Sequence, residues 1–238
     1  MKTVLVCLLF AVAALAQSPE RAWEPKPRAR EYPWMSLSAW NARHDAMLRR
    51  ALAGRVDVLF LGDSITEGWG DNAVWQRFYA PRNAANFGIG GDTTQNVLWR
   101  IENGALVGLA PQVVVLMIGT NNLGLHNDSP EDVAKGVAAI LRTLHRRQPH
   151  ARVLLLGLFP RDAQPDTKHR RSITDINARL AQLADGRAVR FLDLGGKFLS
   201  PDGTLAREIM PDFLHLSEKG YSLWAEGMEP VLAEMLAR

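Results

Sequence analysis

The chain is poor in the residue patterns that build disulfide, metal and nucleic-acid sites. Its 238 residues include one cysteine, Cys7, which excludes an intramolecular disulfide. The six histidines show no metal spacing such as His-Glu-x-x-His, and neither a metal nor an organic cofactor is expected. The formal net charge is only +3, and no Arg-rich helix or basic stripe with interleaved aromatics occurs. Nucleic acid is therefore not an expected partner.

No apolar run is long enough for a comfortable membrane span. The run from Val4 to Leu15 is shorter than the roughly 20 residues that a spanning helix needs. It follows Lys2 and ends in the small-x-small pattern Ala14-Leu15-Ala16, which is typical of a secretory signal. We predict a signal peptide over residues 1–16, a secreted or periplasmic protein, and no stable membrane anchor.

Composition and length indicate one folded domain. The chain is 47% hydrophobic and 22% charged, which suits a sizeable core but is short for two domains. Residues 17–34 hold four prolines among charged residues, so an extended lead-in is predicted there. The domain itself is predicted over residues 35–238. There is no internal repeat and no low-complexity tract.

A strand-and-turn pattern near residue 60 is the most informative local feature. The apolar stretch from Val56 to Leu61 runs directly into Gly62-Asp63-Ser64, and a helix-like stretch follows. A buried strand of this kind places the residues after it at the carboxyl edge of a parallel sheet, where ligands bind in open α/β folds. Ser64 is therefore a candidate nucleophile. The alternative is that Asp63 and Ser64 only cap the next helix.

A second polar cluster, Asp212-Phe213-Leu214-His215, supplies a candidate base and its orienting acid. A serine hydroxyl needs a base to take its proton, and the base needs a group that fixes its tautomer. Two intervening residues allow the Asp212 carboxylate to reach Nδ1 of His215, which leaves Nε2 free to face Ser64. Asp193, at the end of another apolar run, is a rival orienting acid that is better explained as a loop cap. No Gly-x-Ser-x-Gly elbow occurs, which argues against the ordinary α/β-hydrolase arrangement.

Two further apolar segments end in groups that suit an oxyanion. Asn86-Phe87 leads into Gly88-Ile89-Gly90-Gly91, where glycine allows close backbone approach and positive φ. The spacing is not that of a dinucleotide fingerprint, and no Walker lysine follows. The run that starts at Val113 ends in Asn121-Asn122, and an Asn amide there can donate to a developing oxyanion. An Asn at a strand end is also a common turn residue.

These four blocks together resemble the SGNH, or GDSL-type, hydrolases. That family carries Ser, Gly, Asn and His in four separated blocks, and this chain has all four in order, with Asn122 where the third block usually has Asp. More narrowly, residues 86–100 and 118–122 are similar to platelet-activating-factor acetylhydrolase catalytic subunits. The resemblance implies Ser64, Asp212 and His215 as catalytic residues and an oxyanion hole from Ser64, Gly91 and Asn121. It also makes a homodimer possible.

The spacing of apolar segments predicts a three-layer α/β/α sandwich with a five-stranded parallel sheet of flavodoxin-like type. Helical patterns separate the expected strands; one covers residues 38–53, one starts at Ser129-Pro130, and one runs from Ser217 onward. The five expected strands begin at or near Val56, Asn86, Val113, Arg152 and Val189.

The function expected from these residues is hydrolysis of short acyl esters. Ile65, Thr120 and Leu214 each flank a proposed catalytic or oxyanion residue and are expected to crowd the acyl pocket, favouring acetyl groups. With secretion, this favours a carbohydrate O-acetylesterase acting on a small-molecule or carbohydrate ester. The alternatives are a lipid acetylhydrolase or lysophospholipase and, from another class, a non-catalytic binding module on the same fold.

Overall fold

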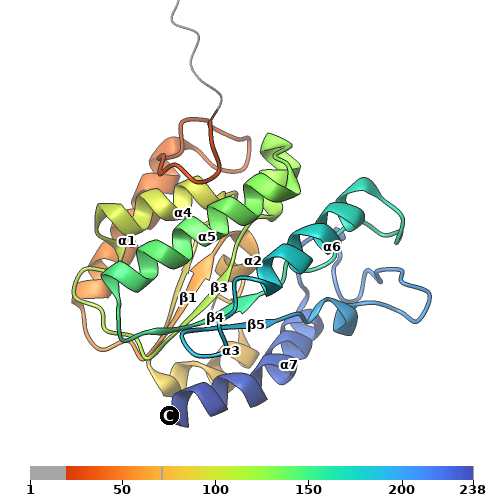
Figure 1. Ribbon diagram of the computed structural model, residues 1–238. Helices are drawn as coiled ribbons and strands as arrows, with labels where there is room; N and C mark the ends of the chain where they lie inside the picture. The colour runs from red at the N-terminus through yellow and green to blue at the C-terminus, as the bar shows by residue number, and fades with distance from the viewer. Residues whose placement is uncertain (1–19, 71, 238) are drawn as a thin grey trace, which may run out of the picture.

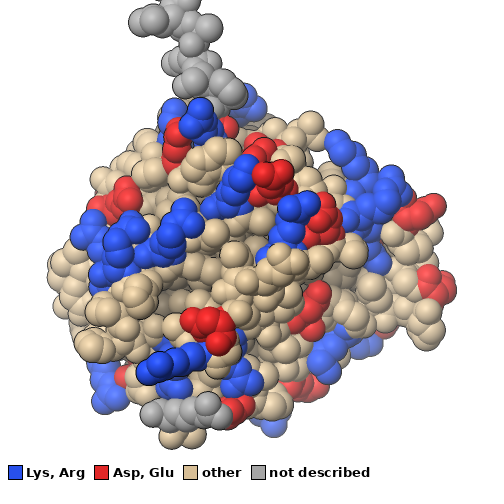
Figure 2. Space-filling model, in the orientation of Figure 1, with Lys and Arg blue, Asp and Glu red and all other residues tan. Residues whose placement is uncertain are grey.

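The computed structural model describes residues 20–70 and 72–237. The predicted signal peptide over residues 1–16 lies outside the described residues, and so does the start of the lead-in. Within the described part of the chain, no helix is both long enough and apolar enough to cross a bilayer. Acidic side chains lie among the basic ones over the face of the molecule shown in Figure 2.

Five strands form one parallel sheet in the order β2-β1-β3-β4-β5. This order and the uniformly parallel pairing confirm the predicted flavodoxin-like sheet. Because β1 lies between β2 and β3, the residues after these three strands meet at one edge. The strands are β1 (Val58–Gly62), β2 (Ala84–Gly88), β3 (Val113–Met117), β4 (Arg152–Leu156) and β5 (Val189–Leu192).

Helices cover both faces of the sheet and make the three predicted layers (Figure 1). In Figure 1, α1, α4 and α5 lie together on one face, and α3 and α7 lie on the opposite face. The helices are α1 (Leu37–Leu52), α2 (Ser64–Glu67), α3 (Ala73–Phe78), α4 (Thr94–Arg100), α5 (Pro130–Arg147), α6 (Lys168–Ala181) and α7 (Glu218–Ala237).

Local sequence signals explain where the principal helices begin. The helix α5 starts as predicted, because the Ser129 side chain accepts a hydrogen bond from the Asp132 N–H and Pro130 occupies the first turn. The helix α1 starts one residue earlier than predicted, at Leu37, because Ser36 acts as its N-cap and accepts from the Ala39 N–H.

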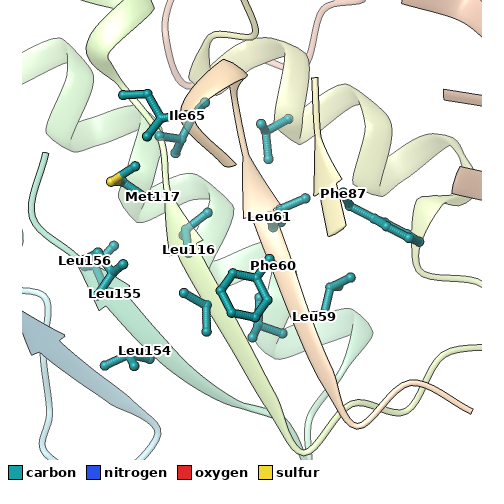
Figure 3. Packing of buried hydrophobic residues seen from close by; sticks show 14 of the residues in the cluster. Leu59, Phe60, Leu61, Ile65, Phe87, Leu116, Met117, Leu154, Leu155 and Leu156 are labelled. Carbon is teal, nitrogen blue, oxygen red and sulfur yellow. The ribbon is translucent and has the colours of Figure 1, made fainter. Parts of the chain in front are cut away.

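The core lies between the sheet and its helices. Figure 3 shows Leu59, Phe60 and Leu61 of β1 packed beside Leu116 of β3, and all four side chains are fully buried. Burial of such a side chain contributes about 1.5–3 kcal/mol relative to exposure. The central strands are buried on both faces, so they are rigid supports for the residues at their carboxyl ends.

The segment before α1 packs against the domain. Its backbone is irregular apart from one isolated bridge between Tyr32 and Met35. The Ala22 carbonyl accepts a hydrogen bond from Thr94 Oγ1 at 2.7 Å, and the Lys26 N–H donates to the Gln95 carbonyl at 3.0 Å. Residues 20–35 are therefore fixed beside the start of α4, although the Pro-rich composition predicts only an extended lead-in. The domain boundary at residue 35 stays a prediction.

Candidate active site

Ser64 lies at the carboxyl end of β1, as predicted, and is the first residue of α2. The Asp63 side chain caps this short helix by accepting a hydrogen bond from the Ile65 N–H at 3.0 Å. The structure therefore contains the capping interaction and also leaves Ser64 partly exposed. Asp63 itself is buried, and burial raises its pKa to about 7.

The Asp212–His215 turn is built around the Asp212 carboxylate. Its Oδ1 accepts hydrogen bonds from the Leu214 N–H at 3.0 Å and from the His215 N–H at 2.7 Å. Phe213 adopts a left-handed φ of 61°, which a non-glycine residue rarely adopts without support from its surroundings. These contacts give the turn one conformation and bring the imidazole back over the carboxylate.

The structure brings Ser64, His215 and Asp212 into one hydrogen-bonded chain. Ser64 Oγ lies 2.9 Å from His215 Nε2, and His215 Nδ1 lies 2.7 Å from Asp212 Oδ2. Burial raises the pKa of Asp212, but the hydrogen bonds from the side chain and backbone of His215 outweigh it, and the net effect lowers that pKa. An ionised Asp212 holds Nδ1 protonated, which leaves Nε2 free to accept the serine proton.

Asp193, the rival orienting acid, takes no part in this chain of contacts. Its carboxylate accepts hydrogen bonds from the Gly195 N–H at 2.8 Å and from the Asn177 side chain at 3.0 Å. It serves as a loop cap beyond β5.

Gly91 lies at the same site. Its φ of 76° lies in the left-handed region that favours glycine, and the position where a Cβ would stand is 2.3 Å from the Trp34 ring and 2.9 Å from Arg28 Nη2. Among the described residues, the Gly91 N–H donates to no protein oxygen. A cavity of about 390 Å³ is lined by Gly91, Asn121, Ser64 and His215 together. These residues were expected to share one site, and they do share this cavity.

The two neighbouring asparagines have different surroundings. Asn121 lines the cavity and donates one amide hydrogen to the Asp92 carbonyl at 2.9 Å, which leaves a second hydrogen on the same nitrogen. Asn122 is fully buried. It accepts from the Thr94 N–H at 3.0 Å and donates to the Asp128 carboxylate at 2.9 Å. Asn122 therefore links the start of α4 to the segment that carries Asp128, whereas Asn121 has an amide hydrogen available to a ligand.

The three residues expected to crowd the acyl pocket are placed differently. Leu214 lines the cavity. Ile65 and Thr120 are 3% exposed each and are not among its lining residues. Arg161, which sequence reasoning missed, lines the cavity instead and donates to the Thr120 carbonyl at 3.3 Å. Ile65 follows Ser64 in α2, and successive residues of a helix point in different directions, so the Ile65 side chain is buried in the core.

A buried charge cluster supports the loop that carries Gly91, and sequence reasoning missed it as well. The Asp92 carboxylate is fully buried and accepts from Arg100 Nε at 2.8 Å and from Trp40 Nε1 at 2.7 Å. Arg28 Nη2 lies 3.3 Å from the same carboxylate. The available signal was Asp92 itself, an acidic residue directly after the glycine cluster. Arg28 had none, because it stands among charged residues in a Pro-rich segment.

Comparison with known proteins shows the family of the chain. A family model described as the GDSL-like Lipase/Acylhydrolase family matches residues 60–223. The chain belongs to this family. The family resemblance drawn from the four sequence blocks is confirmed, and the protein is a carboxylic ester hydrolase.

Relatives and solved structures extend the comparison. Platelet-activating factor acetylhydrolase IB subunit alpha1 of Homo sapiens is 35% identical over 218 residues, which is 90% of this chain and 93% of the relative. A putative platelet activating factor structure from Streptococcus pneumonia is 22% identical, covers 81% of this chain and 92% of its own, and has a TM-score of 0.69. An acetyl xylan esterase structure is also 22% identical, covers 74% and 100%, and has a TM-score of 0.61. At this identity the two structures show the fold alone.

Proposed function

We propose that this esterase is a secreted carbohydrate O-acetylesterase that uses Ser64 as nucleophile, His215 as base and Asp212 as orienting acid. The observation that carries the proposal is the 2.9 Å contact between Ser64 Oγ and His215 Nε2, two residues that line one cavity together with Gly91. A hydroxyl, a base and an unused donor around one cavity are the parts that acyl transfer requires.

In the first half of the reaction, Ser64 Oγ attacks the ester carbonyl carbon while His215 Nε2 takes the serine proton. Negative charge develops on the former carbonyl oxygen, which the Ser64 N–H, the Gly91 N–H and the Asn121 amide are proposed to bind. When the C–O bond to the alcohol breaks, His215 gives its proton to the leaving oxygen. The products of this half are the free alcohol and the acetyl-enzyme.

In the second half, water replaces the alcohol. His215 takes a proton from the water, and the resulting hydroxide attacks the acetyl carbonyl carbon. The bond to Ser64 Oγ then breaks, the serine regains its proton from His215, and acetic acid leaves. Asp212 stays ionised throughout and stabilises the imidazolium that forms in each half.

The proposed preference for acetyl rests on two side chains that line the catalytic cavity. Leu214 and Arg161 lie on its wall. Arg161 donates a hydrogen bond to the Thr120 carbonyl, and its side chain is only 16% exposed. The Arg161 side chain therefore has little freedom to move away from a longer acyl chain. An added methylene that meets a closed wall costs about 1–3 kcal/mol through overpacking.

The proposed sugar alcohol rests on a neighbouring cavity. This second cavity, of about 510 Å³, shares Gly91 and Leu125 with the catalytic one. Its lining residues include Tyr32 and Asp128, which offer an aromatic ring and a carboxylate to a hydroxyl-rich ligand. Export of the protein, supported by the Lys2-led apolar run and the Ala14-Leu15-Ala16 pattern, fits an extracellular carbohydrate substrate.

A lipid acetyl ester is the second candidate substrate. It is favoured by the 35% identity to the platelet-activating factor acetylhydrolase subunit, which extends over 90% of this chain. The two candidates share the acyl half and the chemistry, and they differ only in the alcohol.

The deciding experiment measures kcat/KM on p-nitrophenyl acetate, acetylated xylan, O-acetylated sialic acid and an acetyl glycerophospholipid. We expect an acetylated carbohydrate to exceed the phospholipid by at least about tenfold, a difference of about 1.4 kcal/mol in transition-state binding. Ser64→Ala supplies the background for each substrate. A preference for the phospholipid would replace the carbohydrate proposal with the lipid one.

A further inference from the structure

Arg28 is a buried cation whose contacts converge on the loop that carries Gly91. Its side chain is 3% exposed. Nη2 donates a hydrogen bond of 2.6 Å to the Gly90 carbonyl and lies 3.3 Å from Asp92 Oδ1. The segment that carries it, residues 20–35, precedes the residues 60–223 matched by the family model.

The Gly90 carbonyl and the Gly91 N–H belong to the same peptide group. A trans peptide is planar, so its C=O and N–H point in opposite directions. A donor that fixes the carbonyl oxygen therefore also fixes the direction of the N–H. A charged donor on the carbonyl also polarises the amide, which makes its N–H a stronger donor.

This peptide group is intrinsically easy to turn over. It joins two glycines, Gly90 and Gly91, which lack the Cβ contacts that restrict other residues, and Gly91 already has φ of 76°. The neighbouring peptide is held from the other side, because the Gly90 N–H donates to Glu67 Oε2 at 2.7 Å. Arg28 is thus the described side chain that holds the carbonyl of the Gly90–Gly91 peptide itself.

The position of Arg28 is fixed by its surroundings. The centroids of the Tyr32, Trp34 and Trp40 rings lie 5.5–5.9 Å from the guanidinium carbon. Within the described part of the chain, Nε and Nη1 of Arg28 have no hydrogen-bond partner. The shortest polar contact of the Arg28 guanidinium is therefore made by Nη2, with the Gly90 carbonyl. With Arg100, Arg28 also places two guanidiniums around the single carboxylate of Asp92.

We propose that Arg28 is a positioning residue that sets the direction of the Gly91 N–H toward the developing oxyanion. The inference rests on the proposed function, in which the Gly91 N–H is an oxyanion donor. It gives residues 20–35 a part in catalysis although they lie outside the matched family region. The competing explanation is that Arg28 only stabilises the packing of this segment.

The test compares Arg28→Met, Arg28→Lys and wild type on p-nitrophenyl acetate, at a temperature where each is folded by circular dichroism. We expect Arg28→Met to lower kcat by about 10- to 10²-fold with KM within about twofold, because misplacement of a transition-state donor acts on kcat. Arg28→Lys keeps a charged donor, and we expect it to recover at least about a third of the lost activation free energy. Arg21→Met, a matched change at an exposed arginine of the same segment, should leave kcat unchanged.

A spectroscopic measurement keeps the inference testable if Arg28→Met does not fold. In ¹⁵N and ¹³C NMR of Arg28→Lys, the Gly91 amide and the Gly90 carbonyl should shift while the resonances of β3 and β4 stay in place. Unchanged kcat in a folded Arg28→Met, or unchanged Gly90 and Gly91 resonances in Arg28→Lys, would overturn the inference. Failure of the proposed function can be distinguished from failure of this inference. If the proposed function is wrong, Ser64→Ala keeps wild-type esterase activity, independently of the results for the Arg28 variants.

Discussion

Gly91→Ala perturbs the proposed oxyanion donor with the smallest possible side chain. The new Cβ would stand 2.3 Å from Trp34 Cη2 and 2.9 Å from Arg28 Nη2, where carbon contacts normally lie at about 3.5–4.0 Å. The Trp34 residue is 54% exposed and can move aside, but Arg28 is buried and cannot. The left-handed φ of 76° adds a further cost of about 1–2 kcal/mol.

The expected result is a large loss of kcat with a moderate loss of stability. A displacement of about 1 Å at a catalytic donor can cost about 10²-fold, so we expect kcat on p-nitrophenyl acetate to fall by about that factor. Urea unfolding should show a loss of about 1–3 kcal/mol. Gly186→Ala is the matched control, because its φ is 71° and nothing lies within 4 Å of its Cβ position. Gly186→Ala should lose stability only through its left-handed backbone conformation, and it should keep wild-type kcat. A Gly91→Ala variant with wild-type kcat would refute the placement of the oxyanion hole.

Three further predictions follow from the described contacts. Asn121→Ala should lower kcat by about 10²- to 10³-fold at nearly constant KM, whereas Asn122→Ala should cost about 1–3 kcal/mol of stability by leaving the buried Thr94 N–H unpaired; a larger kcat loss at Asn122 would reverse the assignment. From p-nitrophenyl acetate to butyrate, kcat/KM should fall at least about tenfold, and Leu214→Ala should partly restore butyrate; a flat profile up to octanoate would favour the lysophospholipase alternative. Because the pKa of Asp63 is raised from 3.8 to about 7 in the folded protein, its contribution to stability is present below about pH 4 and is lost as pH rises toward 7. The free energy of unfolding of Asp63→Asn, measured in urea at several pH values, should therefore rise relative to that of wild type over that range, by up to about 4 kcal/mol. A difference between the two proteins that does not change with pH would contradict the raised pKa.

The sheet and most of the site could be predicted from the sequence because each block is local. An apolar strand followed by a glycine turn determines where Ser64, Gly91 and Asn121 lie, since parallel strands end at one edge. The Asp212–His215 contact is also local, because the turn between the two residues closes on itself. These features depend on neighbours in the chain, and composition and spacing carry that information.

The remaining features depend on contacts between distant segments. Arg28 and Gly90 are 62 residues apart, and a charged Pro-rich composition predicts a linker whether or not a domain holds it. The acyl pocket shows the same limit. Proximity in sequence to a catalytic residue suggested Ile65 and Thr120, but successive residues in a helical turn point in different directions, and both side chains are buried. Arg161, which lines the cavity, follows β4 and not a catalytic strand.

Covalent labelling of the folded enzyme with a fluorophosphonate tests the nucleophile most directly. The reagent phosphonylates a serine only where a base activates the hydroxyl, as the 2.9 Å contact with His215 Nε2 implies for Ser64. We predict one phosphonyl group per chain, found by peptide mass spectrometry on Ser64, with esterase activity lost in parallel and no labelling of Ser64→Ala. Full activity after labelling, or a label on another residue that accompanies the loss of activity, would contradict Ser64 as the nucleophile.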